Sequence, residues 1–179
     1  MNVSLKIVRF LFIIISISCV FQESAWALNV GDRVPSCLLK NMNDTTDGIN
    51  LEQLKGKPLY IDFWASWCGP CVKSFPYMDK VERIYKNKGF QVLAINLDEN
   101  IEDAYEFLKK IPAGFSILQD KGQQCAKKFD VKAMPSSYLI DRQGIVQYIH
   151  LGFRSGEVNE LEAQLEKIVN TDFDNSIGF

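Results

Sequence analysis

The stretch LYIDFWASWCGPC, residues 59–71, joins an apolar strand pattern directly to a Cys-x-x-Cys pair. A segment with helical periodicity follows it. Cys68 and Cys71 are close enough in sequence to form a disulfide bridge. At a strand-to-helix junction, unpaired amide N–H groups and the helix dipole favour a thiolate at the first cysteine. The stretch therefore indicates an α/β fold that carries a thiol–disulfide exchange site.

Metal binding is the main alternative for an isolated Cys-x-x-Cys pair. A structural zinc site needs a second pair of ligands. The cysteines at 37 and 125 stand alone, and His150 is the only histidine. A copper(I) chaperone would use Cys68 and Cys71 as soft ligands, but the chain has no Met-x-x-Met or His-rich tract. We therefore expect no metal and no cofactor.

The rest of the chain alternates between strand and helix patterns, which favours a mixed sheet flanked by helices. Asn50 is a candidate helix cap, Pro76 predicts a helix kink, and Gly144 suits a hairpin turn. One domain is expected over residues 28–170, with a frayed tail over 171–179. Further strands are predicted at 36–40, 90–97, 115–118, 137–140 and 145–149, and helices at 51–54, 68–87, 101–111, 123–129 and 157–169.

The first 27 residues have the pattern of a secretory signal peptide. Lys6 and Arg9 precede an apolar run, and Ala25-Trp26-Ala27 offers a cleavage site. An uncleaved anchor and lipidation at Cys19 are the alternatives. The chain carries 20 Lys and Arg against 22 Asp and Glu without a block of like charge, so nothing points to nucleic acid or a polybasic membrane patch.

Several motifs resemble the thioredoxin superfamily. The run from Asp62 to Cys71 is similar to the thioredoxin active-site segment, and Met134-Pro135 to its cis-proline loop. The Leu51 to Pro58 lead-in and the sequence at 75–78 resemble the exported TlpA/ResA/CcmG branch. The resemblance covers roughly residues 30 to 169. It implies a thioredoxin-like fold with an N-terminal hairpin extension and an extra helix after the second central strand.

The resemblance places four residues in the catalytic set: Cys68, Cys71, Asp62 and Pro135. Cys68, the more exposed cysteine, is expected to attack the substrate, and Cys71 is expected to resolve the mixed disulfide. Asp62 is the candidate acceptor of the Cys71 proton, because burial would raise the pKa of its carboxyl toward neutrality.

The residues next to Pro135 and to the cysteines are expected to bind the substrate. Pro135 should be cis and should lie opposite the cysteines, with Met134 beside it able to pair with an extended segment. Trp67 is expected in the exposed docking surface, and Trp64 at the edge of the site. The dipeptide Gly69-Pro70 resembles that of thioredoxin, a strong reductant.

Two departures from the family pattern change the charges near the cysteines. Ser74 stands where many members of the exported branch have Glu, and Ala94 where thioredoxin has Lys. Cys37 and Cys125 are predicted to be partly buried small hydrophobes, with a disulfide between them as the alternative. His150 is predicted to be structural.

These observations predict an exported, monomeric disulfide reductase. The resemblance implies protein substrates with cysteine pairs, of the cytochrome c maturation or copper-site assembly type, and a membrane thiol donor of electrons. A disulfide oxidase or isomerase is the alternative within the same chemistry.

Overall fold

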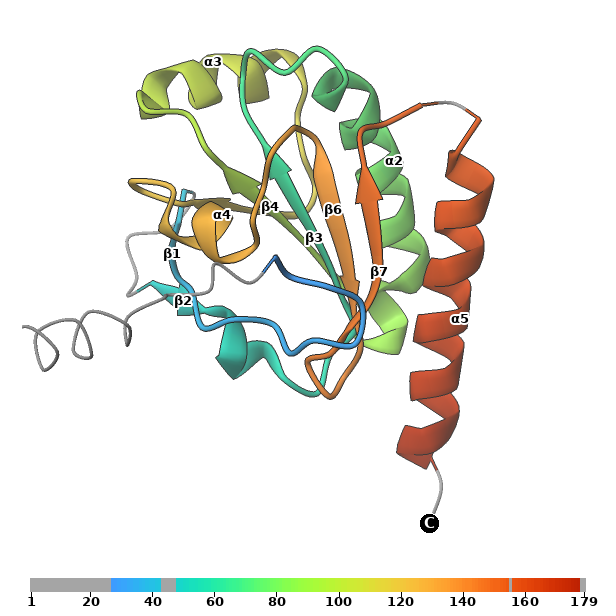
Figure 1. Cartoon of the computed structure of the whole chain (residues 1–179). Helices are drawn as coiled ribbons and strands as arrows, with labels where there is room; N and C mark the ends of the chain where they lie inside the picture. The colour runs from blue at the N-terminus through green and yellow to red at the C-terminus, as the bar shows by residue number, and fades with distance from the viewer. Residues whose placement is uncertain (1–26, 43–47, 155, 178–179) are drawn as a thin grey trace, which may run out of the picture.

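The computed structural model describes residues 27–42, 48–154 and 156–177, with side chains up to residue 170 (Figure 1). Within these residues seven strands form one sheet in the order β2-β1-β5-β4-β3-β6-β7. The elements are β1 (Leu38–Asn41), β2 (Ile49–Asn50), η1 (Leu51–Leu54), β3 (Leu59–Trp64), α2 (Cys71–Tyr85), η2 (Lys86–Lys88), β4 (Gln91–Asn96), α3 (Ile101–Lys110), β5 (Ser116–Gln119), α4 (Gln124–Lys128), β6 (Ser136–Ile140), β7 (Val146–Leu151) and α5 (Val158–Ile177).

Strand β3 lies in the interior of the sheet, as its apolar run predicts. It pairs in parallel with β4 and antiparallel with β6, and all of its residues are buried. The N-terminal hairpin of β1 and β2 adds to the far edge through β5, and α3 is the extra helix after β4. The predicted thioredoxin-like α/β fold, with its hairpin extension and inserted helix, is confirmed.

Alternation along β3 divides the core into two layers. Tyr60 and Trp64 face the layer that contains residues of α2, α3 and α5. Ile61 and Phe63 face the opposite layer, which contains residues of α4, η1 and the segment before β1. Figure 1 shows α4 on the other side of the sheet from α2 and α5.

The boundaries of two helices differ from the prediction. Helix α2 begins at Cys71 rather than at Cys68, because residues 68–70 form tight turns with N–H to carbonyl bonds three residues apart. Helix α5 continues to Ile177 instead of ending at Val169, since neither Gly nor Pro occurs between positions 157 and 177. Pro76 lies inside α2, and the helix continues through it.

Two local predictions, a helix cap and a hairpin turn, are confirmed. The Asn50 side chain accepts a hydrogen bond from the Glu52 N–H at 3.1 Å and caps η1. Gly144 has φ 79° in the β6–β7 hairpin, a left-handed conformation that side chains other than glycine rarely adopt.

Cys37 and Cys125 form a disulfide with a Cα–Cα distance of 5.4 Å. The preferred interpretation of them as two separate small hydrophobes is wrong, and the alternative is right. The bond joins the residue before β1 to α4 across 88 positions of sequence. Both cysteines are buried, in the layer opposite to α2.

The predicted signal peptide lies outside the described residues, apart from Ala27. In the part of the chain that the structure describes, no helix combines the length and the apolar character needed to cross a membrane.

Candidate redox site

A second disulfide, between Cys68 and Cys71, lies at the carboxyl end of β3. Its Cα–Cα distance is 5.3 Å. The chain leaves β3 at Trp64, turns through residues 65–70 and begins α2 at Cys71. The predicted pair is therefore brought together in its oxidised form, at the amino end of a helix.

Local electrostatics favour negative charge on Cys68. The Cys71 N–H donates a hydrogen bond to Cys68 Sγ at 3.3 Å, and the first turn of α2 contains no acidic residue. The positive end of the helix dipole therefore acts on this sulfur without a competing carboxylate. Cys68 is 4% exposed and Cys71 is 0% exposed, in the predicted order.

Asp98 holds the loop that precedes the cysteines, and sequence reasoning missed it. The Ser66 N–H donates to Asp98 Oδ2 and the Ser66 hydroxyl to Asp98 Oδ1, both at 2.9 Å. Asn96 Nδ2 also donates to Asp98, at 2.7 Å. A buried carboxylate after β4 thus restrains a loop after β3. The signal available in the sequence was an acidic residue immediately after a predicted buried strand.

Asp62 is fully buried on the face of β3 that packs against α2. Burial raises the pKa of its carboxyl to about 7, while a hydrogen bond from the Ser137 hydroxyl opposes this rise. Its neighbour on β4 is Ala94, at the position inferred from the sequence. The carboxyl therefore faces an apolar residue on one side and the Ser137 hydroxyl on the other.

The Met134–Pro135 peptide bond is cis, as predicted. It directly precedes β6, the antiparallel neighbour of β3. Pro135 is buried, and Met134 is half-buried. Met134 packs against the same apolar layer that contains Cys68 and Cys71.

The two tryptophans near the pair differ in environment. Trp67 is 72% exposed, and Gly69 and Pro70 beside it are exposed as well. Trp64 is fully buried, with ring centroids 4.8 Å from Phe75 and 4.9 Å from Phe107. Trp64 points from β3 into the core layer that also contains Cys68 and Cys71.

Ser74 and His150 have local structural contacts. The buried Ser74 hydroxyl donates to the carbonyl of Cys71 at 3.2 Å. His150 is buried on β7, with Nε2 3.7 Å from Glu157 Oε2. Among the described residues no cluster of three or more His, Cys, Asp or Glu side chains is arranged to hold a metal ion.

A bridged cysteine pair at this helix terminus, in this sheet topology, defines a thioredoxin-like thiol–disulfide oxidoreductase. Comparison with known proteins agrees with this class. The chain belongs to the Redoxin family, which matches residues 29–165.

Two curated relatives are named as thiol-disulfide oxidoreductases. The chain is 33% identical over 141 residues to a thiol-disulfide oxidoreductase ResA of Bacillus cereus, covering 79% of each chain. It is 31% identical over 126 residues to ResA of Bacillus subtilis, covering 70% of this chain and 69% of that one.

Solved structures extend the similarity to the fold. A Chlorobium tepidum protein, provisionally assigned as the thiol:disulfide interchange protein DsbE, matches with a TM-score of 0.75 and 42% identity. The match covers 80% of this chain and 99% of that chain. The chain is thus a thiol–disulfide oxidoreductase of the ResA/DsbE type, a class that acts on cysteine-containing proteins.

Proposed function

We propose that this protein is an exported reductase of cysteine pairs in partner proteins. The observation that carries the proposal is the Cys68–Cys71 disulfide at the start of α2, with an N–H donor on Cys68 and a fully buried Cys71. This asymmetry suits one sulfur for attack and the other for resolution.

The reaction would begin with the reduced form. The Cys68 thiolate attacks a substrate disulfide, a mixed disulfide forms, and one substrate sulfur leaves as a thiolate. Cys71 then gives its proton to Asp62 and attacks Cys68 Sγ. The Cys68–Cys71 bond forms, the second substrate sulfur leaves, and two electrons have passed to the substrate.

Substrate docking is proposed for the surface around the pair. Trp67 offers a large exposed apolar side chain, which suits recognition of an apolar partner surface. The Met134 backbone before β6 would pair with an extended substrate segment, a sequence-tolerant mode of binding. Gly69-Pro70 would form the exposed floor of this surface.

Export is proposed from the N-terminal pattern, and the Cys37–Cys125 disulfide supports it. Buried structural disulfides persist in oxidising compartments and are rare in the cytosol. In such a compartment, a reductase needs a supply of two electrons for each turnover, for which we propose a membrane thiol carrier. The family resemblance favours substrates of the cytochrome c maturation or copper-site assembly type, and a monomer.

The reduction potential of the Cys68–Cys71 couple tests the direction of electron flow. We would equilibrate the protein with thiol buffers and follow this couple by site-resolved alkylation and mass spectrometry, which separates it from Cys37–Cys125. A potential near that of thioredoxin, about −270 mV, would support a reductase. A potential near that of DsbA, about −120 mV, would replace this proposal with an oxidase or isomerase.

A trapping experiment tests the substrates. Cys71→Ser should hold partner proteins as mixed disulfides on Cys68, and Cys68→Ser is the matched control that should hold none. If Cys71→Ser captures no cysteine-pair protein in the exported fraction, the proposed substrate class is wrong. Fractionation of the producing cells tests the location.

A further inference from the structure

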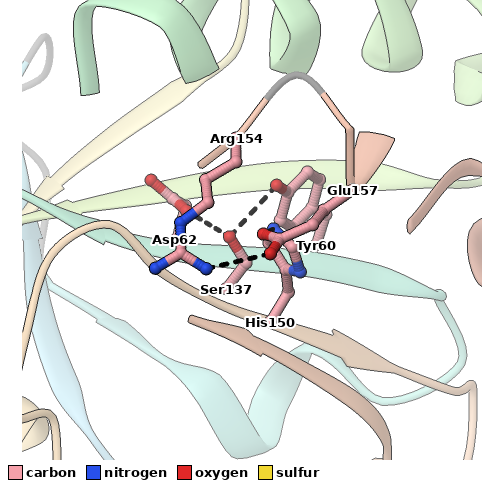
Figure 2. Close-up of polar contacts among 6 residues, drawn as sticks. All are labelled: Tyr60, Asp62, Ser137, His150, Arg154 and Glu157. Atoms are coloured by element: carbon pink, nitrogen blue, oxygen red, sulfur yellow. Dashed lines mark hydrogen bonds and ion pairs between the residues drawn. The ribbon is translucent and has the colours of Figure 1, made fainter. Parts of the chain in front are cut away.

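A row of polar side chains crosses an otherwise apolar face of the sheet (Figure 2). Asp62 on β3 pairs with Ser137 on β6, and Ser137 pairs with His150 on β7. Paired residues of neighbouring strands point to the same face. The row therefore runs across one face of the sheet from β3 to β7, and the proposed reaction uses only Asp62.

The hydrogen bonds in this row have a defined direction. The Ser137 hydroxyl donates to Asp62 Oδ1 at 2.5 Å. Its only proton is thereby used, so in the 3.1 Å contact between Tyr60 and Ser137 the Tyr60 hydroxyl is the donor. The Tyr60 proton therefore points to Ser137 and the Ser137 proton to Asp62, and Figure 2 shows the three side chains linked in that order.

The two oxygens of Asp62 differ in their partners. Oδ1 accepts the Ser137 bond, whereas Oδ2 is buried and has no hydrogen-bond partner among the described residues. A carboxyl with one satisfied oxygen and one open oxygen suits a group that takes up a proton at a fixed position. Fixed donors to a carboxylate also favour its charged form, against the effect of burial.

Other titratable and charged groups surround this row. Tyr77 on α2 acts electrostatically on Tyr60. On the β7 side, His150 lies near Glu157, and Arg154 Nη1 donates to Glu157 Oε1 at 3.0 Å. The β4 neighbour of Asp62 is Ala94, which has no charge. The direct hydrogen bond to Asp62 thus comes from Ser137, a neutral side chain.

We propose that Ser137 and Tyr60 are positioning residues for the resolving step, which hold Asp62 Oδ1 and leave Oδ2 to receive the proton of Cys71. The inference rests on the proposed role of Asp62 as proton acceptor. Burial raises the pKa of Tyr60 well above its ordinary value, so the Tyr60 hydroxyl keeps its proton and remains a donor throughout the working pH range.

The first measurement is the titration of Asp62 itself, by carboxyl NMR of the full oxidised chain. Ser137→Ala should raise the midpoint by about one to two pH units, the effect of losing a hydrogen bond to a charged group. Tyr60→Phe should raise the midpoint by less, about half a unit, because Tyr60 acts through Ser137 and the lost hydrogen bond joins two neutral groups. Ser137→Thr, which keeps the hydroxyl, should restore the original midpoint.

Tyr138→Phe is the matched control, because it removes a buried hydroxyl from the opposite face of β6. The Tyr138 hydroxyl donates to the Phe129 carbonyl at 3.1 Å. This variant should leave the Asp62 midpoint unchanged. An equal shift in Tyr138→Phe and Ser137→Ala would overturn the proposal, because both would then act through general loosening of the core.

The second measurement is the rate at which a preformed mixed disulfide on Cys68 is released, as a function of pH. Its midpoint should follow the Asp62 titration in each variant. If Asp62→Asn leaves this profile unchanged, the acceptor role in the proposed function fails. If Asp62→Asn changes the profile while Ser137→Ala and Tyr60→Phe leave it and the titration unchanged, only the positioning inference fails.

Discussion

The two disulfides of this protein are alike in size and burial but differ in what surrounds them. Their Cα–Cα distances are 5.3 and 5.4 Å. Cys68 and Cys37 are each 4% exposed. Exposure of the cysteine residues therefore does not separate the proposed reactive bond from the structural one. The difference lies in the neighbouring groups and in the length of chain that each bond closes.

Asp120 is hydrogen-bonded directly to the Cys37–Cys125 disulfide segment, Asp62 is the proposed proton acceptor of Cys71, and the two aspartates have different hydrogen-bond partners. Asp120 accepts hydrogen bonds from the N–H groups of Cys125 and Ala126 at 3.1 and 2.8 Å, so both of its oxygens are satisfied. Asp62 has one satisfied oxygen and one open oxygen. The first arrangement stabilises the start of α4, and the second leaves one oxygen open for the proposed proton transfer.

The largest expected difference between the two disulfides is in activity. Cys68→Ser should lower the rate of protein-disulfide reduction at least about 10³-fold, because it removes the attacking sulfur. The double change Cys37→Ala, Cys125→Ala should leave the rate within about twofold under conditions where it remains folded. A reductase assay on a protein disulfide measures both. Loss of activity in the double variant would show that both bonds take part in the chemistry.

Stability should show the opposite order. The Cys37–Cys125 bond closes a loop with a sequence separation of 88, so its removal should lower the free energy of unfolding by about 2–5 kcal/mol. Cys68→Ala, Cys71→Ala opens a loop with a separation of only 3 and should cost less, about 2 kcal/mol. Urea unfolding of both double variants measures the two losses in free energy of unfolding. Equal losses would contradict the structural role of the longer loop.

The two aspartates should respond to substitution with opposite signs. The native Asp62 carboxyl holds its proton to about pH 7, against an ordinary pKa of 3.8. Between these values unfolding releases a proton, so stability falls as the pH rises. In the oxidised protein, Asp62→Asn should therefore raise the free energy of unfolding above pH 7, by up to about 4 kcal/mol, and change it little below pH 4.

Asp120→Asn is the control for this prediction. It removes an acceptor from the start of α4 and should destabilise the protein by about 1–2 kcal/mol at neutral pH. Urea unfolding measured across the pH range checks both aspartates. A destabilised Asp62→Asn protein at high pH would mean that Asp62 is a satisfied structural carboxylate, like Asp120.

The smallest expected effect concerns the exposed side chain next to each disulfide. Trp67 follows Ser66 and precedes Cys68, and Leu38, which is 76% exposed, follows Cys37. Trp67→Ala should raise KM for a protein substrate by about 5–20-fold, the effect of removing an interface anchor. Leu38→Ala should leave KM unchanged. Equal effects in steady-state kinetics would place docking outside the Cys68–Cys71 surface.

Features that depend on neighbouring residues were correctly predicted from the sequence. The apolar run at Leu59–Trp64 specified the central strand, because alternation and length are local properties. The Asn50 cap, the Gly144 turn and the placement of Cys68 and Cys71 between strand and helix also depend on short segments. The motifs around Asp62 and Met134-Pro135 indicated the type of fold, because they resemble motifs of the thioredoxin superfamily.

Tertiary structure alone decided which distant residues meet. Cys37 reaches Cys125, Ser66 reaches Asp98, and Asp62 reaches Ser137 through strand pairing and helix packing. No local pattern encodes these contacts, because a sheet brings residues together according to strand order and register. The sequence by itself therefore determined the class of chemistry and the placement of Cys68 and Cys71 between strand and helix, whereas the folded sheet determined the polar surroundings of Asp62 and the position of the second disulfide.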